Sequence, residues 1–309
     1  MQNATPKKAN MAFVLSMVIF GTIGIFRRYI PLPSGLIAFS RGLIGMLFLL
    51  VFVAVRGIRL SKENIRKNGL KLLLSGAFLG FNWILLFEAY RYTSVAVATL
   101  CYYMAPILVV LASPLLFGER LGGRKLLCVV VALAGMVLVS GVVDTGFGGG
   151  ENAKGVLLGL GAAVLYASVV LMNKKITGIS SYEKTIVQLG TAAIVILPYT
   201  LLTETVDPQA WSLRSVLCLL FVGIVHTGVA YALYFGAVSD MKAQTAALFS
   251  YLDPVVAILL SALLLGEPMT LWVGIGAVLV LGAALLCEME PATRQVASGR
   301  DEEQKKVES

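Results

Sequence analysis

The sequence predicts an all-α polytopic membrane protein whose ten transmembrane helices form two inverted five-helix repeats around a central cavity. Three observations support this fold class: an apolar composition, a phrase that occurs twice, and an uneven distribution of basic residues. The 309 residues are 58% hydrophobic and 14% charged, whereas soluble domains average about 45–50% and about 25%. No soluble fold of this length needs so much apolar surface. The length suits about ten spans of ~20 residues with short loops.

Ten apolar runs, separated by short polar stretches, mark the expected helices in order. A helix rises about 1.5 Å per residue, so a run of about 20 residues crosses a hydrocarbon core of about 30 Å. The runs cover approximately residues 11–30, 34–55, 69–92, 94–117, 124–143, 153–173, 182–203, 212–238, 243–265 and 271–288. A cytoplasmic N-terminal segment, residues 1–10, precedes them. A charged cytoplasmic tail, residues 289–309, follows them and is expected to be disordered.

A phrase in the fourth run occurs again in the ninth. A shift of 148 residues aligns the two copies and pairs Tyr103 with Tyr251, Pro106 with Pro254, Gly118 with Gly266 and Glu119 with Glu267. Proline lacks an N–H donor and clashes with the preceding turn, so Pro106 and Pro254 are expected to interrupt their helices. The chain is therefore interpreted as a duplicated unit. Residues 11–143 and 153–288 form the two repeats, and the glycine-rich linker 144–152 joins them.

The lysines and arginines indicate the orientation of the chain. With the N-terminus inside, most of them fall in inner segments, and the loop after the second run contains six: Arg56, Arg59, Lys62, Arg66, Lys67 and Lys71. The equivalent loop of the second repeat, residues 204–214, contains Glu204, Asp207 and a single Arg214. Because cytoplasmic loops are rich in basic residues, both termini are expected to be cytoplasmic, and the net charge of +8 is attributed to topology rather than to nucleic-acid binding. An odd number of spans per repeat would invert the second copy, a common plan of secondary transporters.

Neither a metal site nor a cofactor is expected. The four cysteines, Cys101, Cys128, Cys218 and Cys287, are isolated in apolar runs and lack the spacing of metal ligands. The linker has no Gly-Lys-Ser/Thr ending, so it is not a phosphate-binding loop. Nucleotide hydrolysis therefore has no support. Two motifs, Gly76-x-x-x-Gly80 and Gly155-x-x-x-Gly159, are expected to allow close crossings of helices within the chain.

With these features, the chain resembles the EamA-type members of the drug/metabolite transporter (DMT) superfamily. The resemblance lies in residues 94–121, SVAVATLCYYMAPILVVLASPLLFGERL, and in the matching residues 242–268. It implies two inverted halves around a central cavity lined by the first, third, fourth, sixth, eighth and ninth helices, with alternating access. The superfamily usually has an acidic residue, most often Glu, before the second proline, and Asp253 occupies that place, whereas Ala105 is its counterpart in the first repeat.

The function that the resemblance implies is secondary transport, with export as the expected direction. The solute would be a small organic molecule such as an amino acid, a metabolite or an amphipathic drug, and proton coupling is one source of driving force. The protein would be a monomer or homodimer in the plasma (inner) membrane and would not be an enzyme. Two alternatives stay open: a membrane-embedded enzyme with His226 and Asp253 as an acid–base pair, and a channel.

Two ionisable residues near the middle of the membrane are candidates for coupling or binding. Asp253 lies roughly ten residues from either end of its run, where an unpaired charge costs about 2.5–3.5 kcal/mol on insertion scales. Its carboxyl must be neutral, paired or hydrated; the alternative to coupling is a protonated Asp that fixes the helix break. His226, the single histidine, has an unperturbed pKa of about 6.5, so it could titrate in the working range. The alternative for His226 is a packing role.

Two further charges lie nearer the outer surface. Glu88 and Arg41 have no charged counterpart in the other repeat. An ion pair between them, acting as a lock or outer gate, is expected because pairing is the least costly way to hold both in lipid. Arg91, one helical turn from Glu88, is the competing partner. Glu88 is also a candidate for proton coupling, with Asp253 and His226.

Aromatic and amide side chains complete the set of candidate binding residues. Rings with a polar edge suit a pocket for an amphipathic solute, although each of them could equally serve in packing. The expected binding residues are Asn82, Trp83, Tyr102, Tyr103, Tyr166, His226, Tyr231, Gln244 and Tyr251, with Phe20 and Tyr234 on the same helices.

Overall fold

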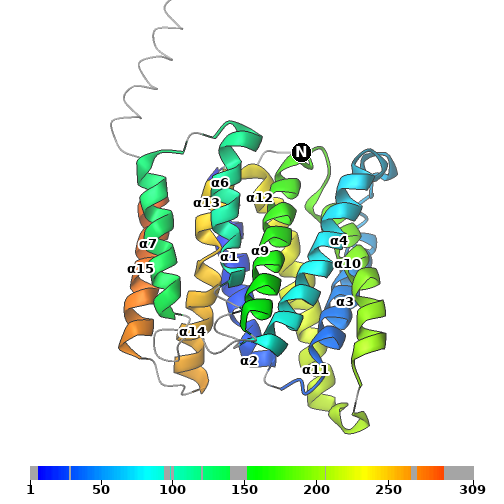
Figure 1. Ribbon diagram of the computed structural model, residues 1–309. Helices are drawn as coiled ribbons and strands as arrows, with labels where there is room; N and C mark the ends of the chain where they lie inside the picture. Colours follow the sequence, from blue (N-terminus) through cyan, green and yellow to red (C-terminus); the bar gives the residue numbers. More distant parts are fainter. Residues whose placement is uncertain are drawn as a thin grey trace, which may run out of the picture.

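The computed structural model describes residues 6–27, 29–93, 98, 101–119, 121–139, 152–205, 207–265 and 270–288 (Figure 1). Within these ranges the regular structure is entirely helical. The tail 289–309 and nearly all of the linker 144–152 lie outside the described residues, so the disorder expected of the tail is not addressed by the structure.

The first half of the chain combines long and short helices. α1 (Pro6–Gly21) and α2 (Ile23–Arg27) are separated by a turn at Thr22. α4 (Lys62–Tyr92) begins after Ser61, whose side chain accepts a hydrogen bond from the Asn64 N–H and so satisfies one unpaired donor of the first turn. The other helices of this half are α3 (Ser34–Val55), α6 (Ala105–Phe117) and α7 (Gly123–Val139).

The second half follows the same order. α10 (Ser181–Thr203) begins with a capping box, in which Ser180 and Glu183 each bond to the other's backbone N–H. A long helix starts as α11 (Leu213–Phe221), continues through a π-helical stretch, η2 (Val222–Val229), and ends as α12 (Ala230–Asp240). The remaining elements are α9 (Asn152–Lys175), the 3₁₀ turn η1 (Pro208–Ala210), α13 (Ala243–Phe249), α14 (Leu252–Leu265) and α15 (Leu271–Glu288).

Six helical segments in the described part of the chain are long and apolar enough to cross a membrane. They are Lys7–Phe26, Ser34–Val55, Lys62–Tyr92, Ala153–Lys175, Ser181–Thr203 and Leu213–Asp240. The other four expected spans contain the shorter helices α6, α7, α13 with α14, and α15. The all-helical membrane class is therefore supported, and the number of ten spans stays a prediction.

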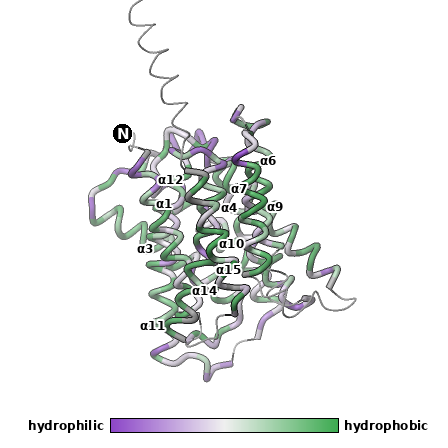
Figure 2. Tube along the Cα trace, turned by 90° about the vertical axis from the view of Figure 1, so that its left-hand side faces the viewer, coloured by the Kyte–Doolittle hydropathy of each residue, from purple (hydrophilic) through white to green (hydrophobic). Residues whose placement is uncertain are grey.

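The surface of the bundle is that of a protein surrounded by lipid. Large apolar side chains are exposed along the helices; Leu115 is 89% exposed, Leu202 84% and Val55 80%. Figure 2 shows hydrophobic residues along the helices and hydrophilic residues mostly in the segments at their ends. Soluble monomers rarely expose contiguous apolar surface on this scale. In a bilayer, helices that satisfy their own backbone groups present such surfaces to lipid.

Helix contacts follow a regular scheme. α1 packs against α12 and α14, and its counterpart α9 packs against α4 and α6. α7 packs against α15, and α3 packs against α10. The shift of 148 residues that aligns the two phrases relates each helix of the first half to one of the second half. When every helix is replaced by its counterpart, the same pairs of helices are in contact. α1 and α9 run in opposite directions along the bundle (Figure 1).

The Gly-x-x-x-Gly motifs lie at close helix crossings within the chain. A Cβ atom on Gly76 would lie 2.8 Å from the Gln188 carbonyl oxygen, and a Cβ atom on Gly80 would lie 3.0 Å from the Ala192 carbonyl oxygen, both in α10. A Cβ atom on Gly159 would lie 2.9 Å from the Cys101 Cβ. These glycines therefore let α4 and α9 approach their neighbours closely, as expected from the sequence.

Candidate functional site

Both prolines of the duplicated phrase lie in the first turn of a helix. α6 begins at Ala105, directly before Pro106. α13 ends at Phe249 and α14 begins at Leu252, two residues before Pro254. Proline is tolerated in a first turn because the N–H that it lacks would have no helical partner there. Each phrase thus contains a non-helical turn with a new helix after it.

The two non-helical turns meet inside the bundle. The Tyr251 hydroxyl donates a hydrogen bond of 3.1 Å to the Tyr103 carbonyl oxygen, and the centroids of the two rings are 6.3 Å apart. The Tyr102 ring contacts the Tyr103 ring at 5.9 Å and the Tyr166 ring of α9 at 5.5 Å. Tyrosines related by the duplication are therefore direct neighbours at the interruption of both phrases.

A small cavity of about 40 Å³ lies beside these turns. Four parts of the chain supply its walls: α1, α9, the start of α6 with the turn before it, and the start of α14 with the turn before it. The lining residues are Met17, Phe20, Tyr102, Tyr103, Ala105, Pro106, Tyr166, Ser250 and Asp253. A water molecule needs about 10–15 Å³ of such space, so the cavity has room for a few waters but not for an organic solute. Because the space is too small for such a solute in this conformation, we call it the closed cavity.

Asp253 is the one acidic residue in the wall of this cavity. It lies in the first turn of α14, where the positive end of the helix dipole favours a carboxylate. None of the ion pairs within the described residues includes Asp253. The guanidinium of Arg41 is the charge with which it interacts electrostatically. A half-buried carboxyl thus faces a space of water size.

Arg41 lies against aromatic rings rather than against a carboxylate. Its guanidinium carbon is 4.4 Å from the centre of the Trp83 ring, a cation–π arrangement. The Trp83 and Tyr231 rings are 6.2 Å apart, and Tyr231 contacts Phe20, which lines the cavity, at 5.0 Å. The Arg41 Nε atom is buried without a hydrogen-bond partner. A chain of aromatic contacts therefore connects Arg41 with the cavity wall.

The expected ion pair between Arg41 and Glu88 does not form. Glu88 instead pairs with Arg91 at 3.0 Å and accepts a hydrogen bond of 2.6 Å from the Tyr199 hydroxyl. Arg91 follows Glu88 by one turn of the same helix, so an exposed side chain reaches the carboxylate without crossing the bundle. The competing partner named from the sequence is the one that the structure uses. Glu88 joins α4 to α10 through Tyr199.

His226 is fully buried in the π-helical stretch η2, away from the cavity lining. Its Nε2 atom is 2.7 Å from Thr22 Oγ1, and its ring contacts Phe26 and Phe221 edge-on at 5.2 and 5.5 Å. Thr22 also donates to the Ile19 carbonyl oxygen at 2.7 Å. These contacts favour the packing alternative for His226.

The two amides among the expected binding residues, Asn82 and Gln244, are buried and connect helices instead of lining the cavity. Asn82 Nδ2 donates to the Ala162 carbonyl oxygen at 2.7 Å and joins α4 to α9. Gln244 Nε2 donates to Ser113 Oγ at 2.8 Å and joins α13 to α6. Their carbonyl oxygens, Asn82 Oδ1 and Gln244 Oε1, are buried without a hydrogen-bond partner. Of the expected binding residues, Tyr102, Tyr103 and Tyr166 line the cavity. Tyr251 contacts the Tyr103 ring, and Trp83 and Tyr231 contact each other.

Glu119, for which a structural role is expected at the end of its helix, joins the two halves of the chain. Its carboxylate accepts hydrogen bonds from the N–H groups of Ala243 at 2.9 Å and Gln244 at 3.4 Å, at the start of α13. Lys174, at the end of α9, pairs with it at 3.2 Å and donates to the Met241 carbonyl oxygen at 2.6 Å. We call Glu119, Lys174 and the α13 N-terminus the inner latch. In the sequence, the Gly-Glu ending that both phrases share was the only feature that drew attention to Glu119.

The comparisons with known proteins agree with this architecture. The model of the EamA-like transporter family matches the chain twice, at residues 7–141 and 153–288. The uncharacterized transporter YxxF of Bacillus subtilis (strain 168) is 31% identical over 96% of this chain and 95% of that protein. An uncharacterized transporter of Archaeoglobus fulgidus is 28% identical over 90% of this chain and 96% of that protein.

A solved crystal structure has the same fold. The protein in it is only 21% identical, but it superposes with a TM-score of 0.80, over 91% of this chain and 97% of the other. The two family matches together cover most of the sequence, and the first relative is similar over nearly its full length. The chain therefore belongs to the EamA-like transporter family, within the drug/metabolite transporter superfamily.

Proposed function

We propose that the protein is a secondary transporter that exports a small organic solute by alternating access. The observation that carries the proposal is the meeting of the two interrupted phrases, Tyr103 against Tyr251, beside a closed cavity that contains Asp253. In secondary transporters, binding sites lie near the midplane where helices of corresponding position are interrupted. A cavity with three tyrosines and one carboxyl suits an amphipathic solute with a hydrogen-bonding or cationic group.

The proposed architecture is ten spans in two inverted repeats, 11–143 and 153–288, with both termini cytoplasmic. Two observations support it: the family model matches each repeat, and the helix contacts are equivalent when the repeats are exchanged. The opposite directions of α1 and α9 agree with inversion (Figure 1). The basic loop after α3 favours the inner membrane with that end of the bundle inside.

In this proposal the cavity opens alternately at the two ends of the bundle. The inner latch holds α13 against the ends of α6 and α9, so it must separate when the cytoplasmic end opens. The contact of Glu88 with Tyr199 joins α4 and α10 near the other end. The inner latch closes the cytoplasmic end, and the contact of Glu88 with Tyr199 closes the other end. If the latch breaks while the other contact stays intact, the cavity opens to the cytoplasm; if the other contact breaks while the latch stays intact, the cavity opens to the opposite side.

Asp253 is the proposed coupling residue. In this proposal the Asp253 carboxyl holds a proton when no solute or cation accompanies it, because an isolated charge in the membrane interior is costly. Opening to water on either side lets it exchange a proton. A solute that needs the ionised carboxyl would then move in exchange for a proton.

A two-stage experiment tests the proposed function. Thermal unfolding of the purified protein is measured against a panel of amino acids, nucleosides and quaternary ammonium compounds, since a ligand that binds the folded form raises its stability. The best compound is then used, radiolabelled, for counterflow into proteoliposomes loaded with the unlabelled compound. A transporter accumulates label transiently. A channel shows no counterflow, and an enzyme returns an altered compound; either result refutes the proposal.

A further inference from the structure

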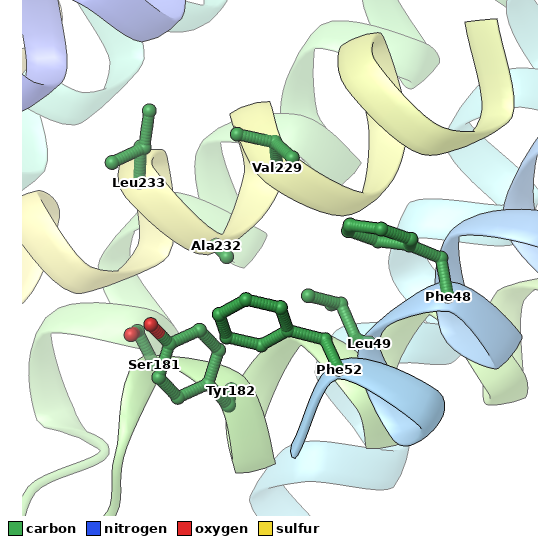
Figure 3. A pocket seen from close by; sticks show the side chains of 8 residues that line it. All are labelled: Phe48, Leu49, Phe52, Ser181, Tyr182, Val229, Ala232 and Leu233. Carbon is green, nitrogen blue, oxygen red and sulfur yellow. The ribbon is translucent and has the colours of Figure 1, made fainter. Parts of the chain in front are cut away.

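A second, larger cavity lies at the side of the bundle. This crevice of about 220 Å³ lies between the end of α3, the start of α10 and the junction of η2 with α12, and it opens at the surface. Figure 3 shows side chains from these three elements surrounding a common space. They are Phe48, Leu49, Phe52, Ser181, Tyr182, Val229, Ala232 and Leu233. The crevice shares no lining residue with the closed cavity.

The walls suit a hydrocarbon chain. Six of the eight lining side chains are purely apolar, and Ser181 and Tyr182 contribute the polar atoms. The Phe52 and Tyr182 rings contact each other at 5.7 Å across the space between α3 and α10. The surface into which the crevice opens belongs to helices that can cross a membrane. An acyl chain of a neighbouring lipid is therefore the apolar molecule that meets this opening.

The hydrophobic effect alone cannot hold a lipid here. A chain that leaves the bilayer for the crevice exchanges one apolar environment for another, because lipid tails are as apolar as leucine side chains. Preference for a particular lipid must come from contacts at its headgroup. The chemistry at the edge of the crevice decides which headgroup fits.

A basic turn borders the crevice. α3 ends in a Schellman motif, in which the N–H of Ile58 bonds to the Val53 carbonyl oxygen and Gly57 adopts a φ of 64°. This left-handed conformation is available to glycine at little cost. The chain then folds back, and Leu60 packs with Phe52 and Tyr182 in one apolar cluster.

The basic residues of this turn lie at the edge of the crevice, and none of the residues that line the crevice carries a carboxylate. The guanidinium of Arg56 lies 5.5 Å from the centre of the Phe52 ring, at the edge of the space. The acidic residue in the first turn of α10, Glu183, is buried, and its carboxylate accepts hydrogen bonds from the N–H groups of Ser61 and Ser180 and from the Ser180 hydroxyl. Arg59 and Lys62 are exposed on the same turn. The edge is therefore positively charged.

We propose that this crevice is a binding site for an anionic phospholipid, with one acyl chain between α3, α10 and α12 and the phosphate at Arg56. The chain packs against Phe48, Phe52 and Ala232. The ring of Phe52 holds Arg56 at the level where the headgroup begins, and the guanidinium offers paired donors to phosphate oxygens. The proposal does not depend on the solute or on transport.

Native mass spectrometry of the delipidated, full-length protein tests it. Dioleoyl phosphatidylglycerol and dioleoyl phosphatidylcholine, which share their acyl chains, are titrated separately, and the fraction of protein with one bound lipid is measured. A basic residue near the membrane surface contributes about a five-fold preference for an anionic lipid. The parent is therefore expected to bind the anionic lipid at least five-fold more tightly.

Three variants locate the site. Arg56→Gln is expected to reduce the affinity for the anionic lipid about five-fold and to leave the weaker binding of the other lipid unchanged. Ala232→Phe fills the crevice and is expected to abolish the first binding step for both lipids. Lys8→Gln removes an exposed charge of α1 and is the matched control, expected to behave as the parent.

Several results would overturn the proposal. One is equal affinity of the parent for the two lipids; another is parental affinity in Arg56→Gln, which is an exposed change and keeps the fold. A third is an equal loss in Lys8→Gln, because that would indicate general attraction to basic surface. If Ala232→Phe unfolds, Val229→Phe replaces it, and undiminished binding in a folded filled variant places the lipid elsewhere.

Discussion

Glu119→Gln is the change that tests the inner latch most directly. The variant keeps an oxygen that can accept from the Ala243 N–H, but it loses the ion pair with Lys174 and the negative charge at the start of α13. The side chains of Lys174 and Glu119 are 16% and 12% exposed, so water screens the pair only partly. Charged hydrogen bonds contribute about 1.5–3 kcal/mol and a charge at a helix N-terminus about 0.3–1 kcal/mol.

After a discount for partial screening by water, Glu119→Gln should reduce the stabilisation of the closed latch by about 1–3 kcal/mol. In the proposed mechanism this loss destabilises only the state in which the latch is closed, because opening of the cytoplasmic end separates the partners. The ratio of open to closed protein should therefore rise by about 5- to 150-fold. A double variant with Lys174→Gln should show less than the sum of the two single effects, since the residues contact each other.

The assay is the labelling rate of a cysteine in the closed cavity. Ser250→Cys is introduced into a chain whose four native cysteines are replaced by serine or alanine, and a membrane-impermeant maleimide is applied from the cytoplasmic side. Glu119→Gln should speed labelling from that side and slow it from the other. The matched control is Glu63→Gln, which breaks an exposed pair with Lys67 on α4 and should change neither rate. Unchanged rates in a folded Glu119→Gln protein, or equal increases from both sides, would refute the latch.

Three further predictions concern the core of the bundle. Asp253→Asn should leave the protein folded and abolish solute movement driven by a pH gradient in proteoliposomes; gradient-driven transport at the parental rate would exclude the coupling role. Gly76→Ala should destabilise the protein by about 1–3 kcal/mol because its Cβ meets the α10 backbone, whereas Gly69→Ala, in open space on the same helix, should be neutral or stabilising by up to about 1 kcal/mol; equal melting temperatures would contradict this. Trp83→Leu should lower the melting temperature more than Trp83→Phe, because only the ring supports the Arg41 guanidinium; the reverse order would remove the cation–π explanation.

The sequence predicted the features that depend on periodicity and local chemistry. Long apolar runs predicted the six span-length helices, and the proline phrases predicted interruptions at the positions where α6 and α14 begin. Three of the expected binding tyrosines and Asp253 line the closed cavity because helices of corresponding position meet in a duplicated fold. These inferences needed only the order of residues along the chain.

The sequence could not specify features that depend on the rotation of each helix about its own axis. Asn82 and Gln244 have the composition of pocket residues but point to neighbouring helices. Glu88 pairs with Arg91 instead of Arg41, because side-chain reach along one helix prevails over depth in the membrane. The inner latch was also missed, because the repeated Gly-Glu ending marks Glu119 but does not show that its partner is Ala243, which lies far away along the chain.

The placement of an acid in only one copy of the phrase has a consequence for energetics. Two identical halves related by a two-fold axis in the membrane plane would make the inward-facing and outward-facing forms equal in energy, so the protein would have no preferred resting side. Asp253 is one of the differences that remove this equality, because Ala105 holds the equivalent place in the other half. In the proposed mechanism, the gain or loss of one proton at this carboxyl therefore changes which side of the membrane the empty carrier faces. The helix packing within each half stays the same.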